Sequence, residues 1–198
     1  MRKFLEETQY INFSDQNIKN QSFYLFQNIT NEVEMARIAF LFVRDSIPHS
    51  FDIKTHIITV KASDVLKYKT GICHAKANLL CALLRSVKIP TGFCFQHITL
   101  NNDDSKGYCV HCYNAILLND KWIKVDATGN TNGKNAQFSI DEPKLAYQNR
   151  SEYDEYHWKG IYASPHKECM KMLENAKTLS DILENIPDRV YDIPDIYE

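Results

Sequence analysis

Three side chains in this sequence have the chemistry needed for nucleophilic attack on an acyl group. Cys73 opens the apolar segment TGICHAKANLLCALLRSVKIP, and His111 and Asp126 follow in YCVHCYNAILL and KWIKVDATGN. A thiol attacks a carbonyl carbon, an imidazole moves protons, and a carboxylate holds the imidazole in one tautomer. We therefore predict that Cys73 is a nucleophile, His111 its general base and acid, and Asp126 the orienting carboxylate.

Cys73 differs from the other five cysteines because it stands where a helix is predicted to begin. It follows Gly71, and helix-forming residues continue to Val87. The unpaired N–H groups and the positive end of the helix dipole at such a position lower a thiol pKa and favour the thiolate. The same amides are suited to stabilising an oxyanion. Three other cysteines are expected to be small buried hydrophobes instead: Cys81, Cys94 and Cys169.

The histidine and the aspartate lie on what the alternation of residues predicts to be a β-hairpin. If Asn119-Asp120 is a two-residue loop, Tyr113 lies opposite Asp126 and His111 lies opposite Thr128. His111 and Asp126 then share one face as diagonal neighbours, at about 7–8 Å between backbones, within reach of each other's side chains. A four-residue loop keeps this parity, whereas a three-residue loop without a bulge breaks it.

Two rival arrangements compete for the same residues. Cys109 and Cys112 have a spacing found in zinc sites, but on a strand they point to opposite faces, and no second pair completes four ligands. His74 adjoins the thiol in sequence, but successive helical residues diverge by about 100°, which makes it a poor base. We expect neither a metal nor a cofactor.

The elements that must position these residues divide into helices first and strands later. Helical spacing covers residues 15–27, 31–46, 63–68 and 73–87. A period of two then predicts strands at 93–100, 108–118 and 121–128, with 136–140 a candidate fourth. Helical patterns return at 166–176 and 179–186, and the segment DIPDIYE after them is expected to be loosely held. This order predicts an α+β fold.

The composition is that of one ordinary globular domain. The 198 residues carry a net charge of −2, so no basic field favours nucleic acid, and no segment is long and apolar enough to cross a membrane. The start, MRKFLEETQY, lacks the apolar core of a signal peptide. We therefore expect a cytoplasmic protein whose six cysteines are reduced thiols.

Taken together, these motifs resemble the transglutaminase-like superfamily of papain-type cysteine enzymes, in its compact microbial form. The matching pieces are Gly71-Ile72-Cys73, the run from Ala77 to Phe93, His111, and Trp122 through Thr128. The resemblance implies a papain-like core, with the nucleophile at a helix N-terminus packed on an antiparallel sheet that carries the histidine and the aspartate. It implies one domain over residues 1–198, with a core at about 31–140 and a helical C-terminal extension at about 141–198.

The resemblance also implies the same roles for Cys73, His111 and Asp126. Animal transglutaminases have a Trp after the nucleophile and acidic calcium loops, whereas this sequence has His74 and lacks such loops. Papain-type enzymes carry an upstream side chain that donates to the oxyanion. The candidates for that donor in this sequence are His49, His56 and Gln96.

The leading functional interpretation is acyl chemistry on an amide bond through a thioester. Water as acceptor makes the protein a cysteine peptidase or amidase, which we favour, and an amine as acceptor makes it a transglutaminase. The expected partner is a peptide, protein or small amide substrate. Two alternatives stay open: an arylamine N-acetyltransferase-like enzyme and a non-catalytic binding module on the same fold. The N-acetyltransferases usually have Arg-Gly-Gly-x-Cys, where this sequence has Lys69-Thr70-Gly71-Ile72-Cys73.

Overall fold

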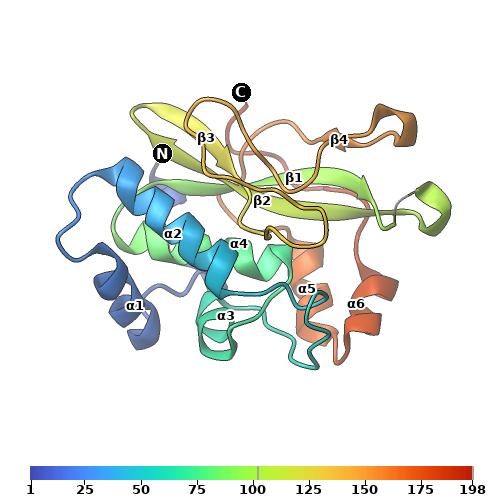
Figure 1. Ribbon diagram of the computed structural model, residues 1–198, viewed down its shortest axis with the longest axis horizontal. Coiled ribbons are helices and arrows are strands. Elements are labelled where there is room, and N and C mark those ends of the chain that lie inside the picture. The colour runs from blue at the N-terminus through green and yellow to red at the C-terminus, as the bar shows by residue number, and fades with distance from the viewer. Residues whose placement is uncertain (102, 198) are drawn as a thin grey trace.

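A computed structural model describes residues 1–101 and 103–197, and its elements follow the predicted order (Figure 1). Four helices precede the sheet, and two follow it. The helices are α1 (Gln16–Phe26), α2 (Glu32–Ser46), α3 (Ala62–Tyr68), α4 (Cys73–Ser86), α5 (Lys167–Asn175) and α6 (Leu179–Asn185). The strands are β1 (Thr91–Thr99), β2 (Tyr108–Leu118), β3 (Lys121–Val125) and β4 (Tyr156–His157). They form one antiparallel sheet in the order β3-β2-β1-β4, so the predicted α+β class is confirmed.

The helices cover one face of this sheet, and α4 lies at the centre of the core (Figure 1). Twelve of its 14 residues are buried, including two cations. Lys76 donates to the carbonyls of Ile47 and Thr128, and Arg85 donates to those of Thr91 and Ala163. Because a buried cation is costly unless it is hydrogen-bonded, these contacts fix the segments around α4 as firmly as apolar packing does.

The β2–β3 hairpin has the register that the sequence predicted. Leu118 pairs with Lys121 across a two-residue loop, and the ladder continues to the pair Asn114–Val125. Asn119 and Asp120 have positive φ angles of 50° and 60°, as the tightest hairpin loops require. The strand β3 ends at Val125, before the predicted residues 126–128, so the backbone pair between Tyr113 and Asp126 is not formed.

The fourth strand is not the predicted one. Residues 136–140 make only an isolated bridge between Gln137 and Lys144, whereas β4 (Tyr156–His157) occupies the open edge of β1. A strand of two residues forms only because it pairs with the neighbouring strand. Its own sequence is too short to show the alternation that predicts a strand.

The prediction of a loose C-terminal segment is wrong. Ile161 and Ile196 exchange backbone hydrogen bonds of 2.7 and 3.2 Å, and the Asp195 carboxylate accepts from the Ala163 N–H at 2.7 Å. Lys3, at the other end of the chain, bonds Asp195 at 2.9 Å. These partners are remote in sequence and leave no local periodicity.

Among the described residues, no helix is both long enough and apolar enough to cross a membrane.

Candidate active site

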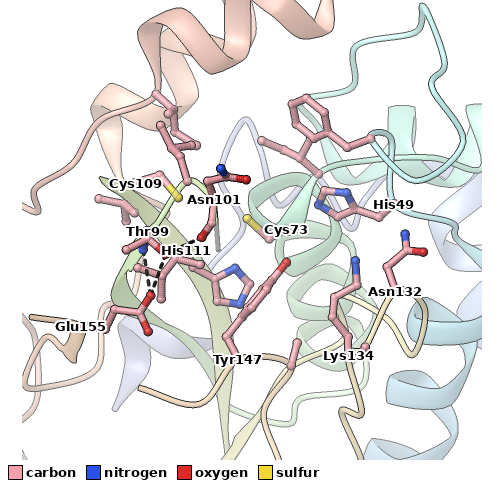
Figure 2. Close-up of a pocket in the computed structure, with 18 of the residues that line it drawn as sticks. His49, Cys73, Thr99, Asn101, Cys109, His111, Asn132, Lys134, Tyr147 and Glu155 are labelled. Carbon is pink, nitrogen blue, oxygen red and sulfur yellow. Dashed lines mark hydrogen bonds between the residues drawn. The ribbon is translucent and has the colours of Figure 1, made fainter. Parts of the chain in front are cut away.

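A cavity of about 740 Å³ brings together residues from both halves of the chain (Figure 2). The cavity is lined by Cys73 at the start of α4, His111 on β2, and residues of the irregular segments that flank the sheet. Figure 2 shows the Cys73 sulfur between the rings of His111 and His49, with Tyr147 approaching from the His111 side. This volume falls in the range of small-molecule and peptide sites, about 300–1,000 Å³.

Cys73 is the first residue of α4 and is half-buried. The preceding residue, Ile72, offers no side-chain cap, and the first backbone bond of the helix runs from the Lys76 N–H to the Ile72 carbonyl at 2.9 Å. The helix therefore leaves the N–H of Cys73 without an intrahelical partner. Gly71 is needed here, since a Cβ on it would lie 3.1 Å from Thr59 Oγ1 and 3.2 Å from the Ala75 Cβ.

His111 and Asp126 form a buried hydrogen-bonded pair. His111 Nε2 lies 2.8 Å from Asp126 Oδ2, and both side chains are at least 97% buried. Asp126 also accepts from the backbone N–H groups of Thr128 and Ala146, each at 3.0 Å. Three donors thus fix the carboxylate, which in turn fixes the imidazole and leaves Nδ1 for the thiol.

The electrostatics of this cluster favour a charged pair. Burial raises the pKa of the Cys73 thiol. This effect is outweighed by the charges of His74 and His111 and by hydrogen bonds from His111 and His49, which together hold the thiol pKa well below its usual range. Burial likewise opposes the charge on His111, yet Asp126 and Cys73 raise its pKa to about 10. Against its burial, His111 and Thr128 lower the pKa of Asp126 to about 2. The three shifts all favour a thiolate paired with an imidazolium that is held by a carboxylate.

Tyr147 holds the ring of His111 from a second side. Its ring meets the imidazole edge-to-face, with the centroids 4.8 Å apart. Gln96, which pairs with His111 across β1 and β2, donates its amide to the Tyr147 carbonyl at 3.3 Å. Burial and the nearby Cys73 charge raise the pKa of the Tyr147 phenol, so it keeps its proton. The imidazole is thus restrained by both packing and hydrogen bonding.

Two ion-paired clusters form polar parts of the cavity rim. On one side, Lys134 Nζ lies 3.1 Å from Asp52, which ties two loops together. On the other side, the buried Glu155 accepts from Arg150 at 2.7 Å and from the Thr99 N–H at 3.0 Å (Figure 2).

Between these clusters the wall is apolar and includes a contribution from the C-terminal part of the chain. Its members are Ile98, Leu100, Leu183 and Ile186. Leu183 is 48% exposed, so its side chain is accessible from the cavity that it lines.

Comparison with known proteins agrees with this geometry. A family profile described as the transglutaminase-like superfamily matches residues 19–127, more than half of the chain. The chain belongs to the transglutaminase-like superfamily. Among curated proteins, no significant match was found.

Several solved structures match part of this chain. A putative cysteine protease from Cytophaga hutchinsonii is 20% identical with a TM-score of 0.52, over 63% of this chain and 40% of that one. A putative protease from Parabacteroides distasonis is 16% identical with a TM-score of 0.42, over 62% and 24% of the two chains. A structure described as a TGase is 13% identical with a TM-score of 0.44, over 69% and 37%. The chain thus spans less than half the length of each of these relatives.

The structure separates the three candidates for the oxyanion donor in this transglutaminase-like chain. His49 lines the cavity beside Cys73. His56 is exposed and lies outside the lining, and Gln96 is buried behind Tyr147. His74, rejected as the base, places Nε2 2.9 Å from the Val110 carbonyl.

The remaining cysteines are free thiols, and Cys81, Cys94 and Cys169 are buried as predicted. Within residues 1–101 and 103–197, no group of three His, Cys, Asp or Glu side chains is arranged to hold a metal ion. The sequence analysis missed Tyr147, Glu155 and Leu183, which lie in segments where the only signal is a cluster of aromatic and charged residues.

Proposed function

We propose that this protein is a cysteine-nucleophile enzyme that cleaves an amide bond through a thioester, with water as the usual acceptor. The observation that supports this most directly is that Cys73 and His111 line one cavity, with His111 bonded to Asp126 at 2.8 Å and lowering the pKa of the thiol. A thiol, a base and an orienting group in this relation are the requirements for covalent acyl catalysis.

In the proposed reaction the Cys73 thiolate attacks the amide carbonyl carbon, and the carbonyl π electrons move to oxygen. The tetrahedral intermediate collapses when the C–N bond breaks and the His111 imidazolium gives its proton to the leaving amine. The neutral imidazole then removes a proton from water, which attacks the thioester. The carboxylic acid departs, and the thiolate–imidazolium pair is restored. Asp126 keeps the imidazole in one orientation through both halves of the cycle.

Hydrolysis is favoured over transfer to an amine because water needs no site of its own. The single cavity at Cys73, about 740 Å³, accommodates one substrate segment, and an amine acceptor would have to share it. Three further recesses on the described surface have no lining residue in common with the Cys73 cavity, and none includes the thiol.

The proposal is tested with peptide amides under acyl-trapping conditions. Wild type and Cys73→Ala are incubated with a peptide library and with glutaminyl peptides, with and without a primary amine. We expect cleaved peptide or released ammonia from wild type alone, and an acyl adduct on Cys73 after rapid acid quenching. Amine incorporation in place of hydrolysis would assign the transferase activity. Equal product in Cys73→Ala, or no acyl adduct under any condition, would refute the proposal and favour a binding module.

A further inference from the structure

His74 links the proposed nucleophile to the strand that carries the proposed base. It is the second residue of α4, directly after Cys73, and its side chain is completely buried. Its Nε2 lies 2.9 Å from the carbonyl oxygen of Val110 on β2, the residue directly before His111. One hydrogen bond therefore joins the chain neighbours of the two groups that must exchange a proton.

The strand that carries His111 needs such a contact, because β2 extends past the end of β3. Residues 108–113 of β2 pair with β1 on one side and with no described strand on the other. Both backbone groups of Val110 instead find partners outside the sheet. Its N–H donates to the Pro187 carbonyl at 2.8 Å, and its carbonyl accepts from His74. These two bonds hold the overhanging part of β2 in place.

The contact with Val110 determines which nitrogen of His74 is a donor. A carbonyl oxygen only accepts, so the proton of the neutral ring is on Nε2. The other nitrogen, Nδ1, is buried and has no hydrogen-bond partner in the described part of the chain. Loss of the donor therefore removes the bond to Val110 and no other hydrogen bond of this side chain.

We propose that His74 is a positioning residue: its bond to β2 sets the separation between the Cys73 thiolate and the His111 ring. The His74 ring does not touch a substrate, because it is completely buried. A base must lie within hydrogen-bond reach of the nucleophile that it serves. The inference rests on the proposed acyl chemistry and adds to it a residue that keeps the base within this reach.

The test measures the pH dependence of Cys73 alkylation by iodoacetamide, which reports the pairing of the thiol with His111. Peptide mapping identifies the alkylated residue, and Cys73→Ala is the blank. His74→Phe keeps a ring but has no donor. His74→Leu also lacks a donor and is smaller, so it replaces the Phe variant if that variant does not fold. His74→Gln keeps an N–H donor, because its amide nitrogen is as many bonds from the backbone as Nε2 is.

The matched control for packing is Phe95→Leu. The Phe95 ring lies 6.4 Å from the His74 ring between centroids, so this change loosens the packing of the histidine without removing its hydrogen bond.

We expect His74→Phe to move the midpoint of the alkylation profile to higher pH by about one pH unit, as when a hydrogen bond to a charged group is lost. His74→Leu should do the same. Above the midpoint, the rate should stay within about threefold of wild type, because the thiol remains accessible. His74→Gln and Phe95→Leu should keep the wild-type midpoint within about 0.3 pH units.

Three results would overturn the assignment. An unchanged midpoint in the donor-free variant would show that the bond to β2 does not position the pair. A His74→Gln midpoint as high as that of His74→Phe would mean that the charge of His74 acts on the thiol directly. An equal change in Phe95→Leu would mean that packing alone sets the separation. In all three cases the wild-type midpoint stays low. A wild-type midpoint near the ordinary thiol value of about 8.5 would instead refute the thiolate–imidazolium pair, and with it both the proposed function and this inference.

Discussion

Removal of the His111 imidazole should slow the alkylation of Cys73 at acid pH. The pKa of the Cys73 thiol lies well below 9.0 against the effect of its burial, because of neighbouring charge and the hydrogen bonds from His111 and His49. In His111→Ala one of the two imidazole charges and one hydrogen bond that lower the thiol pKa disappear, while burial still raises it. The thiol should then titrate at or above its ordinary value.

The size of the effect follows from these two states. At pH 6 a thiol with a pKa of 9.0 is ionised to about one part in a thousand, whereas an ion-paired Cys73 is mostly thiolate. A thiolate of lower basicity is intrinsically less nucleophilic, and a Brønsted slope of about 0.4–0.5 offsets about half of that gain on a logarithmic scale. We therefore expect His111→Ala to slow alkylation by iodoacetamide at pH 6 by about 30-fold.

The assay follows alkylation at Cys73 by peptide mapping from pH 4 to pH 10, with Cys73→Ala as the blank. Mapping is needed because Cys109 also lines the cavity, although burial, the largest cause, raises its pKa to about 12. His56→Ala is the control for a histidine that does not contact the thiol. Equal rates for wild type and His111→Ala at pH 6 would refute the ion pair and with it the electrostatic argument for catalysis.

Three further changes probe other parts of the site. Asp126→Asn should lower kcat/KM by about 10²–10⁴-fold. The alkaline limb of the pH–rate profile is expected near the His111 pKa of about 10. In Asp126→Asn this limb should move to lower pH, because the imidazolium loses its carboxylate. Glu155→Ala should reduce the free energy of unfolding at pH 7 by about 1–3 kcal/mol in urea titrations, because the buried Thr99 N–H loses its acceptor. The wild-type contribution of this carboxylate should be complete above pH 4.5 and fade as the pH falls toward its folded pKa of about 2, since Arg150 and Thr99 outweigh burial and lower that pKa. Leu183→Asp should raise KM for peptides with an apolar side chain by about tenfold or more, with little change in the rate of Cys73 alkylation. An unchanged KM would show that the apolar wall does not bind the substrate.

The parts of the fold that the sequence revealed are those with local patterns. The alternation of residues and the Asn119-Asp120 loop determine the hairpin register, and the apolar stripe locates α4 with Cys73 at its start. The contact between His111 and Asp126 followed from that register, although Asp126 lies just beyond the last residue of β3.

The parts that the sequence did not reveal depend on contacts between distant segments. The edge strand β4 has two residues, too few for a periodic pattern. Tyr147 lies in an irregular stretch and is brought to His111 by its contact with Gln96. The third donor to Asp126 is the backbone N–H of Ala146. Every residue type except proline has a backbone N–H. The identity of residue 146 therefore could not predict this hydrogen bond.

The division of the cavity between two stretches of chain has a consequence for how such a protein diversifies. Residues 73–126 carry the three proposed catalytic residues, whereas much of the surrounding wall comes from residues 132–186. A graft of the later stretch from a relative should therefore transfer a new substrate preference onto the same thiolate. The two stretches are joined at Ala146, whose N–H reaches Asp126 at 3.0 Å. Such a graft must keep a backbone N–H at that position, which proline lacks, and a side chain small enough to pack where Ala146 meets the core.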